Sequence, residues 1–344
     1  MKKALFLLLA AALTLPAFAC SDFVVKAENG TVVNGRSMEF PIDLKSNIVI
    51  RPRGEYVQTV DSQGQPGISW TSKYGFLGIN AFGLATCFVE GFNERGLAIG
   101  GLMFVGARYQ NAVPGRSLPI DAISAWALGN FASVDEVKAA LPSVAICDSS
   151  LKKLKDLGMH ITFHDAAGKN LVVEFIGGQV NIYDNPLGVL TNRPEFPWQM
   201  NNLRNYVNLD ARDKDERKLN GVKIEALGVG SGLLGLPGDW TPPSRFVRLA
   251  FGVDSALPPK DAAGAVNLAG HLLNMVDIPK GAIKENTDIP LYFQYGYAQW
   301  AVIKNLTDQV LYYRTYDNPA WRSVDLKKFD LAPGKPLRTI VMGT

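Results

Sequence analysis

A cysteine stands where the mature chain is expected to begin, and in that position it could act as a nucleophile. Residues 1–19 are typical of a secretory signal: Lys2 and Lys3 precede an apolar run, and Ala17-Phe18-Ala19 forms an A-x-A cleavage site. Cleavage there makes Cys20 the first residue. A free thiol titrates near ~8.5 and an α-amine near ~7.7 to 8, so the chain's own amine can serve as the base for the thiol beside it.

The same cysteine also fits a lipoprotein, in which acylation tethers the mature N-terminus to a membrane. A lipobox usually has Leu three residues before the cysteine and small residues between them, whereas this chain has Ala17 and the bulky Phe18 there. Two interpretations therefore stay open: a catalytic N-terminal thiol, or a lipid-anchored binding protein without activity. The mass of the mature N-terminus distinguishes them.

The composition excludes several classes of protein. The 344 residues are 47% hydrophobic and 19% charged, which is typical of a globular chain and not of a disordered, collagen-like or coiled-coil one. The 35 Lys and Arg against 32 Asp and Glu leave a formal charge of +3, too small to indicate binding to nucleic acid. Beyond the leader no stretch approaches ~18 continuous apolar residues, so we expect an exported, periplasmic protein without stable membrane insertion.

The elements that hold Cys20 are predicted from the sequence around it. Two runs rich in β-branched residues flank Asn29-Gly30, which is a strong signal of a hairpin. Pairing of the strands about this turn places Glu39 opposite Cys20 and Arg36 a few residues further along the hairpin. An arginine beside a thiol favours the thiolate, and a nearby carboxylate can hold the α-ammonium group. Alternatively, Arg36 and Glu39 form an ordinary surface ion pair.

The rest of the chain predicts an α+β fold of antiparallel sheets packed against helices. Short Gly/Asn turns join the expected strands, without the regular strand–helix alternation of a parallel sheet. We expect a single domain over 20–344, with a long loop at 228–243. The expected strands are 48–51, 86–90, 96–104, 160–164, 171–175 and 180–183, and the expected helices are 119–128, 133–140, 198–206, 244–251 and 261–276.

Several short blocks follow one another along the chain after Cys20. They are Gly-Arg-Ser-Met-Glu-Phe at 35–40, Asn-Glu-Arg-Gly-Leu at 93–97, Gly-Leu-Met-Phe at 101–104, Gly-Val-Leu-Thr-Asn-Arg-Pro at 188–194, Leu-Pro-Gly-Asp at 236–239 and Ser-Arg-Phe at 244–246. This order resembles the choloylglycine hydrolase and penicillin V acylase family, whose C-terminal strands are similar to 295–316. The resemblance implies an N-terminal-nucleophile hydrolase with a four-layer αββα sandwich, commonly a homotetramer. The signal peptide indicates the family's exported Gram-negative branch.

The resemblance assigns the residues of the first hairpin to the reaction centre. By position, Cys20 is the nucleophile and its α-amine is the base, while Arg36 flanks the thiolate. Many relatives have Asp where this chain has Glu39, whose side chain is one methylene longer. The carboxylate can keep its role only if the local geometry shifts.

The resemblance also assigns residues from later blocks. Asn192 matches the family's oxyanion-hole side chain, a fixed N–H donor whose loss costs on the order of 2.7 to 4 kcal/mol. Met103 falls where relatives carry Asn or Tyr; its side chain has no donor, so only its backbone N–H could complete the oxyanion hole. Arg245 matches a second active-site arginine. Without the resemblance, an Asn near a proline is a turn residue and an Arg near a helix start is structural.

The implied reaction is hydrolysis of a linear amide through a thioester, without a metal ion or other cofactor. His160 and His164 lie four residues apart on an expected strand, a separation of roughly 13 Å that is too large for one shared metal ion. We expect small-molecule substrates with an apolar or aromatic acyl group. Penicillin V and N-acyl homoserine lactones are the first candidates, and conjugated bile salts are the alternative.

Two further features stay open in the sequence. Cys87 and Cys147 could form a disulfide in an oxidising compartment or remain buried thiols. Aromatic residues near the blocks could line the acyl pocket or belong to the core. These candidates are Phe40, Phe82, Phe104 and Trp198.

Overall fold

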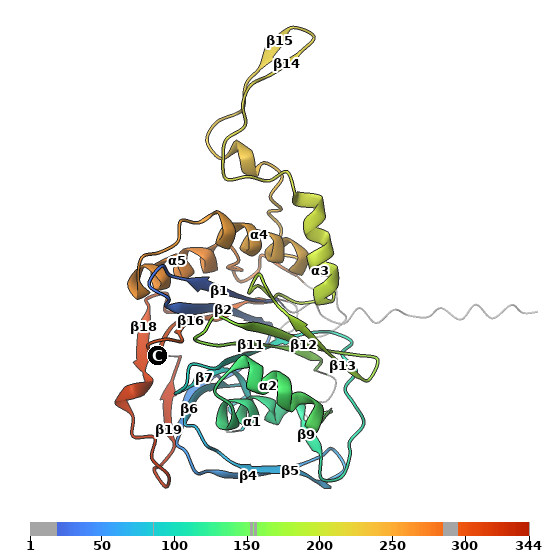
Figure 1. The fold of residues 1–344 in the computed structure, drawn as a ribbon, viewed down its shortest axis with the longest axis vertical. Helices are drawn as coiled ribbons and strands as arrows, with labels where there is room; N and C mark the ends of the chain where they lie inside the picture. Colours follow the sequence, from blue (N-terminus) through green and yellow to red (C-terminus); the bar gives the residue numbers. More distant parts are fainter. Residues whose placement is uncertain (1–18, 85, 152–153, 155–156, 285–294, 344) are drawn as a thin grey trace, which may run out of the picture.

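The structure, a computed structural model, describes residues 19–84, 86–151, 154, 157–284 and 295–343. Two antiparallel sheets are stacked between two layers of helices (Figure 1). One sheet has 5 strands in the order β1-β2-β16-β17-β18, and the other has 8 in the order β13-β12-β11-β8-β7-β6-β3-β19. Helices α4 and α5 cover the 5-stranded sheet, and α1 covers the 8-stranded sheet with α2 beside it. The predicted α+β fold with αββα layers is therefore present.

The elements have the following bounds. The 5-stranded sheet contains β1 (Cys20–Lys26), β2 (Val32–Phe40), β16 (Tyr297–Asn305), β17 (Val310–Thr315) and β18 (Arg322–Asp325). The 8-stranded sheet contains β3 (Asn47–Arg51), β6 (Phe76–Asn80), β7 (Phe88–Asn93), β8 (Ala98–Met103), β11 (Met159–His164), β12 (Asn170–Ile176), β13 (Gln179–Asp184) and β19 (Arg338–Val341). Short pairs are β4 (Tyr56–Val60) with β5 (Pro66–Thr71), β9 (Ser117–Pro119) with β10 (Ala145–Cys147), and β14 (Arg217–Leu219) with β15 (Val222–Ile224). The helices are α1 (Ile123–Asn130), α2 (Val134–Ala140), α3 (Phe196–Asn202), α4 (Pro242–Ser255) and α5 (Ala262–Asn274).

The predicted helices and long strands are present within a few residues of their expected ends. In two helices, α2 and α5, the first residue of the expected range is the N-cap. Ser133 accepts a hydrogen bond from the Glu136 N–H at 3.3 Å, and Asp261 accepts one from the Gly264 N–H at 2.9 Å. The short strand pairs, the inner strand β6 and the edge strands β18 and β19 have no counterpart in the sequence prediction, because such short segments carry little alternation.

The first hairpin turns through a longer loop than predicted. The last pair of the ladder is Lys26 with Val32, and the Ala27 N–H donates to the Thr31 carbonyl oxygen at 2.9 Å. A two-residue type I′ turn needs a positive φ at both central residues, whereas only Gly30 has one here, at 86°. The ladder is therefore shifted by one residue from the expected register.

The shifted register corrects the predicted position of Glu39. Cys20 lies opposite Met38, so the prediction that Glu39 lies opposite Cys20 is wrong. Neighbouring side chains on a strand alternate between the two faces of the sheet. Cys20, Met38 and Arg36 face the 8-stranded sheet, and Glu39 faces the helical layer of α4 and α5.

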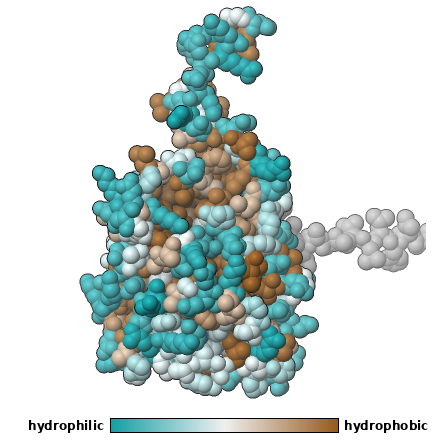
Figure 2. Space-filling model, in the orientation of Figure 1, coloured by the Kyte–Doolittle hydropathy of each residue, from teal (hydrophilic) through white to brown (hydrophobic). Residues whose placement is uncertain are grey.

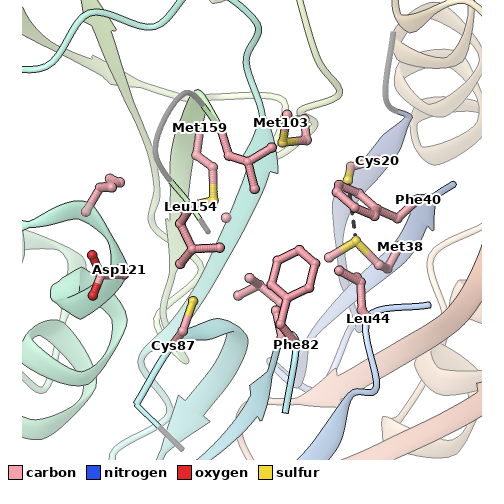
Figure 3. Close-up of a pocket in the computed structure, with 15 residues that line it drawn as sticks. Cys20, Met38, Phe40, Leu44, Phe82, Cys87, Met103, Asp121, Leu154 and Met159 are labelled. Carbon is pink, nitrogen blue, oxygen red and sulfur yellow. Dashed lines mark hydrogen bonds between the residues drawn. The ribbon is translucent and has the colours of Figure 1, made fainter. Parts of the chain in front are cut away.

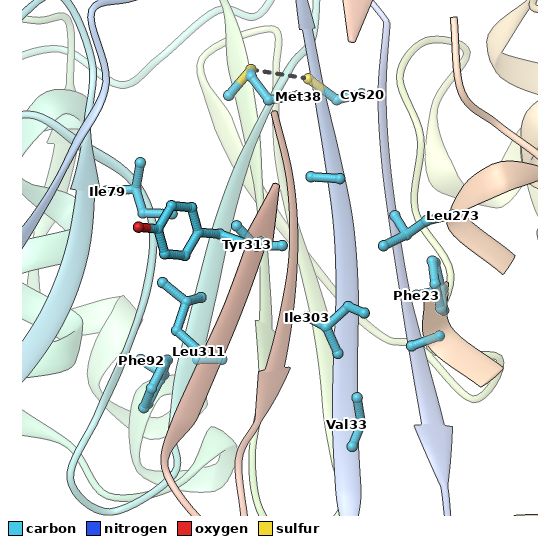
Figure 4. Close-up of a cluster of buried hydrophobic side chains, with 14 of the residues drawn as sticks. Cys20, Phe23, Val33, Met38, Ile79, Phe92, Leu273, Ile303, Leu311 and Tyr313 are labelled. Carbon is cyan, nitrogen blue, oxygen red and sulfur yellow. Dashed lines mark hydrogen bonds between the residues drawn. The ribbon is translucent and has the colours of Figure 1, made fainter. Parts of the chain in front are cut away.

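Apolar side chains fill the space on both sides of the 5-stranded sheet (Figure 4). Between the sheets, Leu311 and Tyr313 point toward Ile79 and Phe92, and Cys20 and Met38 lie at one end of this cluster. On the other side, Phe23 points toward Leu273 of α5. Burying one such side chain contributes about 1.5 to 3 kcal/mol, so the strands that carry Cys20 are firmly held.

An arm, residues 207–236, projects from the layers beyond α3 and carries the β14–β15 hairpin (Figure 1). It includes the first half of the expected loop 228–243. Hydrophobic surface gathers where the arm joins the body (Figure 2). The exposed apolar side chains of the arm are Val207, Leu219, Val222, Ile224, Leu227, Val229 and Leu234.

The cysteines other than Cys20 are buried and unpaired in the structure. Burial raises the pKa of Cys87 to about 12 and that of Cys147 to about 11, so both thiols are neutral. Of the two alternatives left open by the sequence, buried thiols are observed. No helix among the described residues is long and apolar enough to cross a membrane. The predicted leader lies outside the described residues except for Ala19.

Candidate active site

Cys20 begins β1 and is only 1% exposed. Its Sγ lies 3.9 Å from the Met38 Sδ and 3.7 Å from the Arg36 Nη2. In the full-length chain Ala19 precedes it, and the Ala19 carbonyl oxygen accepts a hydrogen bond from the Glu39 N–H at 3.1 Å. The thiol is therefore held beside a guanidinium group, as the sequence predicts for Cys20 and Arg36.

A short β-bridge brings Asn192 to Cys20, although the two residues are 172 positions apart. The Asp22 N–H donates to the Leu190 carbonyl oxygen at 2.8 Å, and the Leu190 N–H donates back to Asp22 at 2.9 Å. Antiparallel pairing at this bridge places Asn192 next to Cys20. The Cys20 N–H donates to the Asn192 Oδ1 at 2.8 Å. The predicted pair is thus in direct contact.

The amide group of Asn192 is oriented by its three partners. Its Oδ1 accepts from the Cys20 N–H and, at 2.9 Å, from the Arg245 Nη2. Its Nδ2 donates to the Met103 carbonyl oxygen at 2.8 Å. An amide nitrogen carries two hydrogens, so one remains for an oxyanion beside Cys20. Met103 thereby orients Asn192 through its carbonyl group; the oxyanion role of its backbone N–H stays a prediction.

Arg245 reaches the same place from helix α4 and is completely buried. Its Nη1 donates to the Cys20 carbonyl oxygen at 2.6 Å and to the Ser21 Oγ at 2.7 Å. Burial lowers the pKa of Arg245, and the charges of Glu39 and Cys20 oppose this effect. Asp239 accepts from the Ser244 hydroxyl and from the Thr241 N–H and hydroxyl at the start of α4. The Leu-Pro-Gly-Asp block therefore positions the helix that carries Arg245.

Glu39 lies on the helical side of the sheet, and neither of its buried carboxyl oxygens makes a hydrogen bond among the described residues. Burial raises its pKa to about 7, while Arg245 and the nearby hydroxyl of Ser37 oppose the shift. Its contact with the Cys20 segment is through its backbone N–H. Glu39 is therefore close to the N-terminus of β1, but on the other face from the thiol.

A buried ion group that the sequence analysis does not predict holds Arg36. The Arg36 Nη1 donates to the Glu90 Oε2 at 3.1 Å, and the Lys304 Nζ pairs with the other oxygen of Glu90. All three side chains are fully buried. The Arg36 Nη2 also donates to the Gly101 carbonyl oxygen at 2.6 Å. Burial lowers the pKa of Arg36, but the charges of Cys20, Glu90 and Asp22 outweigh burial and raise it.

Glu90 and Lys304 lie on different sheets, on β7 and β16, so the ion group ties the two sheets together beside Cys20. The signal in the sequence is one charged residue inside each apolar strand, which alone does not reveal the partner. Asp22 is likewise a charged residue inside an apolar strand, and the sequence does not reveal its partner. Its Oδ1 lies 2.7 Å from the His164 Nε2, and its Oδ2 has no partner among the described residues.

Replacing both members of the Glu90–Lys304 ion pair, in the double variant Glu90→Gln with Lys304→Met, is expected to lower kcat by about 10- to 100-fold and to change KM little. Arg36 would lose its carboxylate partner but keep its hydrogen bonds to the Val89 and Gly101 carbonyl oxygens. Because Lys304→Met removes the second buried cation together with Glu90, the fold should persist. Steady-state kinetics and the rate of Cys20 alkylation by iodoacetamide, which should also fall, measure the effect.

Two further variants separate positioning from stability. Glu90→Gln alone leaves the Lys304 ammonium buried without a partner, and should lower the free energy of unfolding by about 3 to 5 kcal/mol. Lys138→Met, which breaks an exposed ion pair with Asp184, should change neither property. Wild-type kcat and alkylation rate in the double variant would contradict a positioning role for Glu90.

An apolar cavity opens beside Cys20, between the two sheets and α1 (Figure 3). Its volume is about 40 Å³. Phe40 and Phe82 line it, as two of the aromatic candidates; Phe104 stacks on His160 instead, and Trp198 is 45% exposed outside the cavity. The lining residues are Cys20, Met38, Phe40, Leu44, Ala81, Phe82, Cys87, Val89, Gly101, Met103, Ile120, Asp121, Leu154, Leu157 and Met159.

The histidines of β11 belong to buried hydrogen-bond networks. His160 lies between the Glu174 carboxyl group, at 3.2 Å, and the Thr191 carbonyl oxygen, at 3.0 Å. It thereby fixes the backbone next to Asn192. Within the described part of the chain no cluster of His, Cys, Asp and Glu could hold a metal ion.

Comparison with known proteins places this geometry in a family. The model of linear amide C–N hydrolases, choloylglycine hydrolase family, matches residues 20–339. The bile salt hydrolase/transferase of Clostridium perfringens is 33% identical over 329 residues, which cover 93% of this chain and 96% of that protein. The penicillin V acylase of Pectobacterium atrosepticum is 27% identical over 339 residues, which cover 92% of this chain and 83% of that protein.

Solved structures show the same fold. A mutant conjugated bile acid hydrolase from Clostridium perfringens matches with a TM-score of 0.80 at 31% identity, covering 93% of this chain and 96% of that one. Penicillin V acylase from Agrobacterium tumefaciens matches with a TM-score of 0.76 at 24% identity, covering 94% and 92%. The fold is that of the N-terminal-nucleophile hydrolases, an αββα sandwich.

The chain belongs to the choloylglycine hydrolase family. It is a hydrolase that acts on carbon–nitrogen bonds other than peptide bonds, in linear amides. The family predicted from the sequence blocks is thereby confirmed.

Proposed function

We propose that the protein hydrolyses N-acyl amides with an apolar or aromatic acyl group, using Cys20 as the nucleophile. One observation carries the proposal: the Cys20 thiol lies at an apolar cavity beside Arg36, and Asn192 and Arg245 hydrogen-bond to the Cys20 backbone. The apolar lining suits an apolar acyl chain, and Arg36 lies at the Cys20 end of the cavity, where the scissile bond would be placed.

The reaction follows from these groups. The Cys20 thiolate, stabilised by Arg36, attacks the amide carbon, and a carbon–sulfur bond forms. The Asn192 Nδ2 donates its free hydrogen to the oxyanion. The Cys20 α-ammonium group, formed when the thiol loses its proton, protonates the leaving amine as the carbon–nitrogen bond breaks. Water then attacks the thioester with the α-amine as base, and the carbon–sulfur bond breaks. The carboxylic acid leaves, and the α-ammonium group returns its proton to the Cys20 sulfur.

Export supplies the free α-amine in this proposal. The leader at 1–19 would be removed in the periplasm, and the nitrogen of Cys20 would remain beside the Asn192 Oδ1. The competing interpretation is a lipid-anchored binding protein without activity. Mass spectrometry of the mature N-terminus tests it: an unmodified Cys20 is expected, and a diacylglyceryl adduct would exclude the proposed mechanism.

Penicillin V and N-acyl homoserine lactones are the proposed first substrates, since their acyl groups are apolar or aromatic. Conjugated bile salts are the second candidate, because the bile salt hydrolase/transferase of Clostridium perfringens shares more identity with this chain than the penicillin V acylase of Pectobacterium atrosepticum. A panel with all three classes, assayed for released amine, tests the proposal. Turnover of none of them by the mature protein would overturn it.

We also propose that the protein is a homo-oligomer, a tetramer by resemblance. The arm, residues 207–236, supports this, because it extends apolar side chains such as Val222 and Leu227 away from the body. Light scattering after gel filtration measures the assembly; a monomer at micromolar concentration would exclude it.

A further inference from the structure

Asp121, whose side chain ends in a carboxyl group, is one of the residues that line the otherwise apolar cavity beside Cys20. Asp121 is 8% exposed, and its Oδ1 is buried without a hydrogen-bond partner. Every other described side chain of the lining is a hydrocarbon, an aromatic ring, a thioether or a thiol. Asp121 is therefore the one lining residue, among those described, that carries oxygen in its side chain.

Asp121 and Cys20 lie at opposite sides of the cavity (Figure 3). The Cys87 thiol lies between Asp121 and the aromatic ring of Phe82 in this view, and the Asp121 charge contributes to the raised pKa of Cys87. An acyl group attached to the Cys20 sulfur would extend from the thiol into the cavity. Its distal end would then extend toward the side of the cavity on which Asp121 lies.

The backbone holds Asp121 firmly in this place. It lies in the 3-10 helix Ile120–Ala122, directly between β9 and α1. Strand β9 is paired with β10, and Ile120 and Ile123 on either side are fully buried. The carboxyl group is thus presented by rigid elements rather than by a loop, as a specific binding site requires.

A carboxyl group in an apolar cavity is costly unless a ligand compensates it. Transfer of a polar group out of water without a hydrogen bond lowers stability, and more so for a charge. A hydrocarbon side chain at position 121 would line the cavity without this cost. This free-energy cost is offset when the ligand donates a hydrogen bond to the carboxyl oxygen.

We propose that Asp121 binds a hydroxyl or ammonium group at the distal end of an otherwise apolar acyl group. The inference rests on the proposed function, since it places the acyl group in this cavity. A methyl-terminated chain would leave the carboxyl unpaired, and an acyl group ending in a carboxylate would be repelled. Sites built around a polar partner discriminate strongly against analogues that lack it.

Matched substrates test the proposal. N-acyl homoserine lactones and phenoxyacetyl amides are prepared in pairs that differ only at the distal end: a terminal hydroxyl or amino group against hydrogen, over a series of chain lengths. At the best length the wild-type kcat/KM is expected to be at least ~10-fold higher for the donor-bearing member. Asp121→Leu should reduce this ratio to about one or below, mainly by lowering the value for the donor-bearing substrate.

Two other variants make the result specific. Asp121→Asn keeps the size of the side chain and one acceptor oxygen, so it should lose the preference for the ammonium group more than the preference for the hydroxyl group; it also serves if Asp121→Leu does not fold. Asp148→Asn removes an exposed carboxyl group from the same neighbourhood and should leave both ratios unchanged.

The outcomes separate this inference from the proposed function. Equal ratios in wild type and in the Asp121 variants, with hydrolysis that depends on Cys20, would overturn the role of Asp121 alone. Hydrolysis of neither member of any pair, or hydrolysis that survives Cys20→Ala, would overturn the proposed function. Calorimetric binding of the same pairs to Cys20→Ala gives an independent readout, with tighter binding expected for the donor-bearing amides.

Discussion

Replacement of Cys20 by alanine is expected to abolish amide hydrolysis, with a loss on the order of 10⁶ in kcat, while the protein stays folded. The change removes the atom that would form the thioester. It keeps the Cβ and the backbone hydrogen bonds to Asn192 and Arg245. Arg36 keeps its bonds to Glu90 and to the Gly101 carbonyl oxygen. Release of amine from the best substrate of the panel measures activity, and circular dichroism checks the fold.

Cys87→Ala is the matched control. This thiol lines the same cavity, but burial raises its pKa to about 12, so it offers no thiolate at neutral pH. Its loss should leave kcat within a few-fold of the wild-type value. Activity that persists in Cys20→Ala and disappears in Cys87→Ala would show that the nucleophile is assigned to the wrong cysteine. An acyl adduct on the peptide beginning with Cys20, detected after rapid quenching, would support the assignment directly.

A chain that retains even one residue before Cys20 is expected to be inactive. In the full-length chain the Cys20 nitrogen belongs to a peptide bond, and its N–H donates to Asn192. An amide nitrogen has no basic lone pair, so it cannot take the proton from the thiol or pass one to the leaving amine. The Ala19 carbonyl group, bonded to the Glu39 N–H, also occupies the space next to Cys20.

Two purified chains test this expectation, one that begins at Cys20 and one that begins at Ala19. Both should show the same circular dichroism spectrum, and only the first should release amine. Treatment of the second chain with an aminopeptidase that removes alanine should restore activity in proportion to the free Cys20 measured by mass spectrometry. Equal kcat for both chains would mean that another group is the base, and the proposed mechanism would fail.

The sequence predicts the elements of this fold better than their register. Strands such as β11 and β12 alternate clearly or are continuously apolar, so their positions follow from pattern alone. The first hairpin shows what the hydrophobic pattern does not determine. The conformation of Asn29 lengthens the loop by one residue, and this moves Glu39 to the other face of the sheet from Cys20.

The site was predictable where the resemblance supplied a position, as for Asn192 and Arg245. Glu90 and Lys304 were not, because their pairing depends on how the two sheets stack, and β7 and β16 are far apart in sequence. The same holds for Asp121, whose significance arises only when several separate segments enclose one cavity.

The buried carboxyl of Glu39 makes folding of the full-length chain depend on proton uptake. Its pKa is about 7 in the folded chain against 4.5 for an ordinary glutamate, so the folded state binds a proton more tightly than the unfolded state. The free energy of unfolding should therefore fall as the pH rises from 4.5 to about 7, and then level off. Glu39→Gln should flatten this slope, measured by the urea midpoint; an unchanged slope would contradict the linkage. Before its leader is removed, the buried Glu39 would thus destabilise the folded chain least on the acidic side of neutrality.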